Sequence, residues 1–150
     1  MRAAGLDLPD AYTVIGEPGR SRARELTRGL LARPDRPTAI ICASDLQAIG
    51  AREAARDLGI VVPEQLAIVG YDDLEIAEYL GLTTVRQPLF ESGVAGVRAL
   101  HGHVADRTAG PVRIVLAVEL IARATTGPVP GSRSDISASR TAMKPVPRGA

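Results

Sequence analysis

Apolar residues along this chain follow two patterns, short continuous runs and longer helical repeats. Continuous runs occupy residues 38–43, 66–70 and 82–86, and residues 46–58, between the first two runs, repeat apolar side chains at helical spacing. Short apolar runs are typical of buried strands. Strands that alternate with helices are typical of a parallel sheet covered by helices. The pattern therefore predicts an α/β fold.

The helix at residues 46–58 has the clearest start signal in the chain. Ser44 and Gln47 have the S-x-x-Q spacing of a capping box, in which each side chain satisfies a free backbone N–H at the helix start. Gly59 is placed to end the helix in a left-handed conformation. The buried stripe is predicted to consist of Leu46, Ile49 and Leu58, with the alanines between them. Strand, helix and strand together predict a right-handed βαβ unit.

Weaker patterns predict the remaining elements. Residues 11–15 are β-prone, and Ser21 is a good N-cap for a following helix. Pro88 is expected at the first position of another helix. The inward stripe of that helix is predicted to be Phe90, Val94, Val97, Leu100 and Val104. Residues 113–116 and 119–123 are strand-like and could form a sheet edge or a hairpin.

A change of composition marks a boundary near residue 126. Residues 127–150 are rich in Pro, Gly and Ser, with isolated basic residues and no apolar period. Such a composition cannot bury enough apolar surface to fold. We therefore expect a folded unit at 1–126 and a disordered tail at 127–150. The tail could contact a polyanion through charge alone, but a solubilising or tolerated extension is the favoured interpretation.

Composition limits the possible function classes. With 150 residues, 45% hydrophobic and 23% charged, the chain is expected to form one globular domain. It contains no apolar run of bilayer-spanning length and no signal-peptide pattern at its start, so a cytoplasmic location without a membrane partner is predicted. The net charge is +1, and the tail supplies the excess of basic residues. The folded part thus lacks the basic footprint of a nucleic-acid binder.

Cysteine and histidine usage indicates neither a redox site nor a metal site. The single cysteine, Cys42, excludes an internal disulfide and lies within an apolar strand, where a buried side chain is expected rather than a nucleophile. His101 and His103 are two residues apart on a predicted helix, so they point in nearly opposite directions and cannot share a metal ion. No cofactor is predicted.

Polar residues follow two of the predicted strands directly. Ser44 and Asp45 come after the run at 38–43, and Asp72 and Asp73 come after the run at 66–70. Parallel strands end at the same edge of a sheet, where α/β folds bind ligands. Carboxylates there accept hydrogen bonds from hydroxyl or amine groups of a small molecule. The same residues are also explained as helix caps and strand ends.

Four motifs in order resemble the LacI/GalR family of bacterial transcription regulators. They are PTAI with ASD within residues 37–45, VPE at 62–64, VGYDD at 69–73 and LTTVRQP at 82–88. The resemblance spans about residues 10–126. It implies a type I periplasmic-binding-protein-like fold, in which an effector, usually a sugar, is held between two Rossmann-like α/β lobes. This chain is similar to the C-terminal, effector-binding and dimerising lobe.

The resemblance also implies roles for particular residues. Asp72 matches an aspartate that contacts the effector, and the position of Ser44 often does so too. Asp45 matches a residue that supports the helix start and the neighbouring loop. Pro18 stands where many family members have a phenylalanine that stacks on the ligand, so this platform differs here. The candidate ligand-binding residues are therefore Asp72, Ser44, Asp45 and Pro18.

Three function classes follow for this chain. The first is the effector-sensing lobe of a regulator that forms a homodimer through the 46–58 helix and the 74–82 segment and binds DNA through a helix-turn-helix expected to be absent from this chain. The second is part of a sugar-binding protein for transport. The third is a magnesium-dependent phosphotransfer enzyme that uses Asp45, Asp72 and Asp73, although there is no Walker loop and no lysine before Lys144. The regulator, which is not an enzyme, is the favoured prediction.

Overall fold

The structure is a computed structural model that describes residues 8–106, 108 and 110–128. Its centre is a four-stranded sheet in the order β1, β2, β3, β4. The strands are Ala39–Ile41 (β1), Ala67–Asp72 (β2), Thr83–Arg86 (β3) and Glu119–Ile121 (β4). The first three run parallel, and β4 pairs antiparallel with β3. The predicted α/β fold and its three parallel strands are confirmed.

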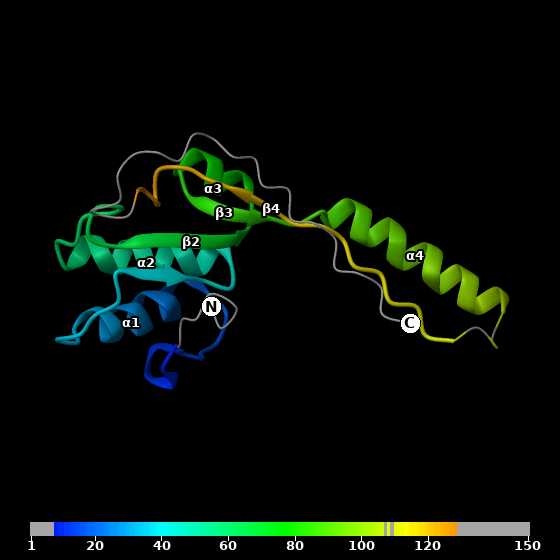
Figure 1. Ribbon diagram of the computed structural model, residues 1–150, viewed down its shortest axis with the longest axis horizontal. Helices are drawn as coiled ribbons and strands as arrows, with labels where there is room; N and C mark the ends of the chain where they lie inside the picture. The colour runs from blue at the N-terminus through cyan, green and yellow to red at the C-terminus, as the bar shows by residue number, and fades with distance from the viewer. Residues whose placement is uncertain (1–7, 107, 109, 129–150) are drawn as a thin grey trace.

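Two helices that pack against each other flank the β1 and β2 part of the sheet (Figure 1). α2 (Asp45–Asp57) lies against β2, and α1 (Arg20–Leu31) packs along α2. Between α2 and the sheet, Leu66 and Ile68 are fully buried against alanines of α2. Ala77 of the short helix α3 (Glu75–Tyr79) closes the same core. The core therefore lies directly behind the strands that carry the candidate site.

The predicted buried stripe of α2 is confirmed for its alanines and wrong for Leu46 and Leu58. Leu46 and Leu58 are 48% and 40% exposed. The buried positions are the predicted alanines, Ala48, Ala51, Ala54 and Ala55, together with Asp45 and Gly50. α2 is covered on two sides, by the sheet and by α1, and a Cβ on Gly50 would overlap the carbonyl oxygen of Arg20. Close packing on two sides requires small side chains, so the large ones lie on the remaining surface.

The N-terminal part differs from prediction in two places. α1 has Gly19 as its N-cap, so Ser21 lies within the first turn. Residues 11–15 form no strand. Instead a 3-10 helix, η2 (Asp10–Tyr12), precedes irregular backbone. The Tyr12 hydroxyl donates to the Asp35 carboxylate at 2.6 Å, and this side-chain contact anchors the segment instead of a strand ladder.

Helix α4 (Leu89–Ala105) projects away from the sheet, and the chain returns alongside it to β4 (Figure 1). Pro88 is the N-cap of α4 rather than its first helical residue, so the helix begins one residue later than predicted. The predicted inward stripe of α4 is wrong, since Phe90 is 80% and Val97 68% exposed. Residues 112–118 line a hollow against the small-residue face of α4 and leave that stripe uncovered. They form no strand, so the hairpin is not formed, whereas β4 confirms the predicted sheet edge.

The remaining predictions concern the ends of elements and of the chain. Gly59 has φ 67° after α2, as its predicted left-handed cap requires. Residues 129–150, nearly all of the predicted disordered tail, lie outside the described residues. Within the described part of the chain, no helix combines the length and the apolar character that crossing a bilayer requires.

Candidate functional site

The parallel strands β1, β2 and β3 end at one edge of the sheet, which we call the carboxyl edge. Ser44 and Asp45 follow β1 and begin α2, while Asp72 is the last residue of β2. β3 ends at the same edge, since its last residue, Arg86, is in register with Asp72 of the parallel strand β2. The parallel arrangement thus brings three of the four predicted site residues to the same edge.

Ser44 caps α2 through its side chain. Its Oγ accepts a hydrogen bond from the Gln47 backbone N–H at 3.2 Å, and Gln47 Oε1 accepts from the Ala43 N–H at 3.1 Å. The capping box is therefore present, with its return bond made one residue earlier than in the usual motif. A hydroxyl that accepts still has its own hydrogen to donate. Ser44 can consequently cap the helix and donate to a ligand at the same time.

Asp45 is fully buried and joins three segments of the lobe. Its Oδ1 accepts from Thr84 Oγ1 on β3 at 2.5 Å, and its Oδ2 accepts from the Leu74 N–H after β2 at 2.8 Å. Gly70 provides the space, because a Cβ there would overlap Asp45 Oδ1. In this structure Asp45 holds the strand ends of the carboxyl edge together rather than facing solvent.

Asp72 is half-buried, with its backbone at φ 115°. Its Oδ1 accepts a hydrogen bond from Gln87 Nε2 at 2.7 Å. An ionised carboxylate has about four acceptor positions on two oxygens, so this single bond leaves most of its capacity for another donor. Asp72 is thus the residue of the carboxyl edge best suited to accept hydrogen bonds from a ligand.

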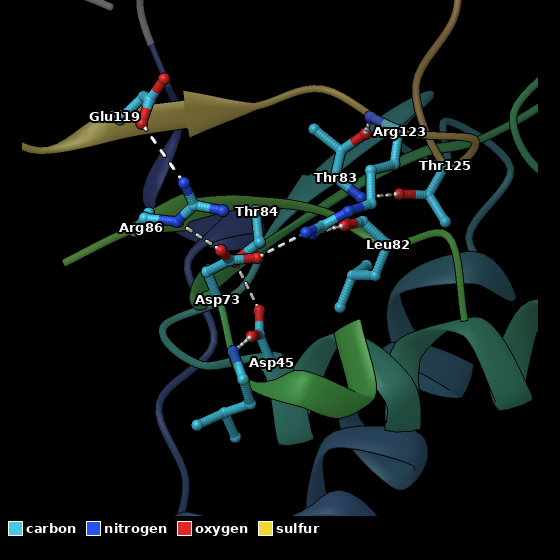
Figure 2. Close-up of polar contacts among 10 residues, drawn as sticks. Asp45, Asp73, Leu82, Thr83, Thr84, Arg86, Glu119, Arg123 and Thr125 are labelled. Atoms are coloured by element: carbon cyan, nitrogen blue, oxygen red, sulfur yellow. Dashed lines mark hydrogen bonds and ion pairs between the residues drawn. The ribbon is translucent and has the colours of Figure 1, made fainter. Parts of the chain in front are cut away.

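Asp73, with φ 59°, contributes a carboxylate that lies between two arginines (Figure 2). Arg86 Nε donates to Asp73 Oδ2 at 2.6 Å. Arg123 Nη2 lies 2.8 Å from Asp73 Oδ1 in an ion pair, although these atoms are not aligned for a hydrogen bond. Burial acts to raise the pKa of Asp73, but the contacts with Arg86 and Arg123 outweigh it and lower the pKa below its usual value.

Pro18 is exposed and directly precedes Gly19, the N-cap of α1. The contacts that join Asp45, Asp72 and Asp73 to their partners do not include it. A hollow of about 320 Å³ lies nearby between residues 14–17, α1 and the end of β1, but Pro18 does not line it. The structure therefore assembles Ser44, Asp45 and Asp72, and it places Pro18 apart from their hydrogen-bond network.

Cys42 lines the same hollow at the end of β1. Burial raises the pKa of its thiol to about 11. A thiol with such a pKa is almost entirely protonated near neutral pH and is a poor nucleophile. This environment agrees with a packing role for Cys42.

Sequence reasoning did not assign roles to Gln87, Arg86 and Arg123. The first two lie in the LTTVRQP motif, so their proximity to the strand end was a usable signal. Arg123 follows β4 and reaches Asp73 from about 50 positions away in the sequence, a pairing that no local pattern indicates.

The periplasmic binding protein-like domain family matches residues 1–126, and the chain belongs to this family. Its relatives are transcription regulators. The chain is 34% identical over 125 residues to the ribose operon repressor of Escherichia coli strain K12, covering 82% of this chain and 38% of the repressor. It thus spans well under half the length of that relative.

Solved structures agree with this assignment. A regulatory protein of the LacI family from Chloroflexus aggregans is 37% identical and superposes with a TM-score of 0.74, covering 85% of this chain and 47% of that one. The transcriptional regulator CelR in complex with cellobiose is 35% identical with a TM-score of 0.75, covering 83% and 38%. The predicted resemblance to LacI-family regulators is confirmed.

Proposed function

We propose that this chain carries the effector-sensing lobe of a LacI-type transcription regulator and that its effector is a sugar. The observation that carries the proposal is the Asp72 carboxylate at the carboxyl edge, with one hydrogen bond to Gln87 and further acceptor positions. Carboxylates in this situation suit the hydroxyl groups of a sugar. The names of two relatives, a ribose operon repressor and a cellobiose complex, favour the same class of ligand.

Each site residue has a distinct role in this proposal. Asp72 accepts hydrogen bonds from ligand hydroxyls, and Ser44 donates its hydroxyl hydrogen while its oxygen caps α2. Asp45 positions the strand ends without touching the ligand. Pro18 offers a small apolar surface, which is a weaker stacking platform than an aromatic ring.

The mechanism is a shift between two lobe arrangements. A small ligand is held well only when most of its surface is buried, and one edge covers a single side of it. We therefore assign the opposite side of the ligand to a second lobe. A sugar that binds one arrangement of the lobes more tightly shifts the protein toward that arrangement. DNA binding, assigned to a helix-turn-helix domain rather than to this lobe, then changes by the same coupling free energy.

We propose that the protein is cytoplasmic and forms a homodimer. The interface is assigned to α2 and the segment at residues 74–82. Exposed apolar side chains on these elements support it, since Leu46 is 48%, Ile76 40% and Tyr79 86% exposed. Exposed apolar clusters on a surface favour association with a partner. Sedimentation over a range of protein concentrations tests this: a dimer is expected, and a monomer at every concentration would contradict it.

We infer a binding role rather than a catalytic one. The three carboxylates have different partners. Asp45 contacts Thr84 and Leu74, Asp72 contacts Gln87, and Asp73 contacts two arginines. Among the described residues no three His, Cys, Asp or Glu side chains gather as ligands for a metal ion. These contacts favour a polar binding edge over a magnesium cluster.

A titration followed by backbone-amide NMR tests the proposal. D-ribose and cellobiose are added separately, up to millimolar concentrations, because a single lobe binds weakly. We expect saturable shifts at residues 43–45, 71–73 and 87 with at least one of these sugars, and saturation only at higher sugar concentrations in Asp72→Asn. Asp57→Asn is the control, since it removes a carboxylate at the other end of α2. Failure of both sugars to shift the carboxyl edge would contradict the proposal.

A further inference from the structure

Two consecutive residues at the end of β2 adopt positive φ angles, 115° at Asp72 and 59° at Asp73. Residues with a Cβ rarely adopt this region, and such a conformation persists only where surrounding contacts hold it. Asp and Asn tolerate it better than most residues, as single positions. A pair of them at the candidate ligand edge therefore calls for a specific anchor.

The side chain of Asp73 is that anchor. It is only 7% exposed, and it contacts Arg86 of β3 at 2.6 Å and Arg123 after β4 at 2.8 Å (Figure 2). Arg123 is itself held, because its Nη1 donates to the backbone carbonyl of Leu82 at 2.9 Å. A nearly buried carboxylate between two arginines resists displacement, since moving it would leave charges unpaired.

The anchor and the candidate ligand residue are adjacent in the same turn. Asp73 binds Arg86, and Asp72 binds Gln87, so two neighbouring residues at the end of β2 contact two neighbouring residues at the end of β3. Rotation of the backbone at Asp73 would move the Asp72 carboxylate away from Gln87. The orientation of the Asp72 side chain thus depends on the ion pairs that Asp73 makes with Arg86 and Arg123.

We propose that Asp73 is a positioning residue for effector binding, which holds the end of β2 in the conformation that directs Asp72 toward Gln87 and the ligand. It does not itself touch the ligand. The claim that Asp73 supports effector binding rests on the proposed function. The claim that Asp73 holds Asp72 against Gln87 is independent of it.

The test compares Asp73→Asn with Asp57→Asn. Both substitutions remove a carboxylate bridged by two arginines, since Asp57 lies 2.6 Å from Arg24 and 3.3 Å from Arg28. Asn tolerates the positive φ at position 73, so the variant removes the charge and leaves the backbone preference. Asp73→Gly, which is free at that φ, serves as a second variant if the first folds poorly.

The first measurement needs no ligand. The Gln87 side-chain amide protons are followed by NMR, and we expect their exchange with water to accelerate in Asp73→Asn and Asp73→Gly but not in Asp57→Asn. In the second measurement, the sugar that shifts the wild-type carboxyl edge should bind Asp73→Asn about tenfold more weakly, as expected if only about a tenth of the variant molecules hold Asp72 in the binding conformation. Affinity of Asp57→Asn should stay unchanged.

The outcomes separate the two proposals. Unaltered Gln87 exchange in both Asp73 variants would overturn the positioning role, whatever the ligand. Normal sugar affinity in Asp73→Asn would do the same. If neither sugar binds the wild-type chain while Gln87 exchange responds as expected, the sugar assignment fails and the conformational role of Asp73 stands.

Discussion

The backbone of Gly70 lies directly against the carboxylate of Asp45, so closely that a Cβ on Gly70 would overlap Oδ1 of Asp45. Gly70 is on β2, and Asp45 is at the start of α2. This contact explains why the strand that carries Asp72 has a glycine two residues before it. It also makes the packing of the carboxyl edge sensitive to a single methyl group.

Gly70→Ala should destabilise the lobe by about 1–3 kcal/mol, the usual cost of overpacking a buried site. The new Cβ would also lie 3.1 Å from Leu82 Cδ2. A shift of the strand away from Asp45 would therefore press the methyl group against Leu82. Urea denaturation measures the change. Gly29→Ala is the matched control, because this helical glycine has open space around it, and a gain of about 0.5–1 kcal/mol is expected there. Equal effects of the two substitutions would contradict the packing account.

The buried hydrogen bond between Thr84 Oγ1 and Asp45 Oδ1 should appear as a coupling energy. Thr84→Val removes the donor and Asp45→Ala removes the acceptor, so each single variant loses the same interaction. A double-mutant cycle on unfolding free energies should give about 0.5–3 kcal/mol of coupling. Strictly additive effects would mean that the two side chains do not interact in solution.

The acid stability of the lobe should depend on Asp73. Its pKa is lower in the folded state than the ordinary value of about 3.9, because Arg86 and Arg123 favour the charged form over the opposing effect of burial. A lowered folded pKa contributes stability that is fully present above about pH 4 and is lost as pH falls through the folded pKa. Asp73→Asn should thus be less stable at pH 7 and should lose less on acidification. Parallel pH profiles for variant and wild type would contradict this.

Cys42 should react slowly with thiol reagents. With a pKa of about 11, its thiolate at pH 7 is scarcer than that of free cysteine by about two orders of magnitude. A colorimetric disulfide-exchange assay on the native chain should show this delay, and urea should abolish it. Native labelling at the rate of free cysteine would show that the thiol is not buried in solution.

Local signals in the sequence predicted the parallel strands, the Ser44 cap and the Gly59 helix end correctly. Each depends on residues that are neighbours along the chain. The alanines of α2 were predicted correctly as buried, but the burial of Leu46 and Leu58 was predicted wrongly, because the rule that large apolar residues face inward fails for a helix packed on two sides. Gly50 and the alanines of α2 were the available signal for that close packing.

Features that depend on distant parts of the chain could not be predicted. Arg123 meets Asp73 only because β4 returns beside β3 after α4. The stripe of α4 has a helical period, but period alone does not say whether another element covers it, and Phe90 is 80% exposed. The carboxyl edge was predictable because parallel strands must end together.

The central claim is that Asp72 binds the effector, and the ratio of two dissociation constants tests it most directly. Binding of whichever of D-ribose and cellobiose shifts the carboxyl edge more strongly is measured by NMR titration for wild type and for Asp72→Asn. Loss of a charged hydrogen-bond acceptor predicts a dissociation constant at least about tenfold higher in Asp72→Asn than in wild type. The control variant Asp57→Asn should bind the sugar with the wild-type dissociation constant. Equal dissociation constants for wild type and Asp72→Asn would contradict the account.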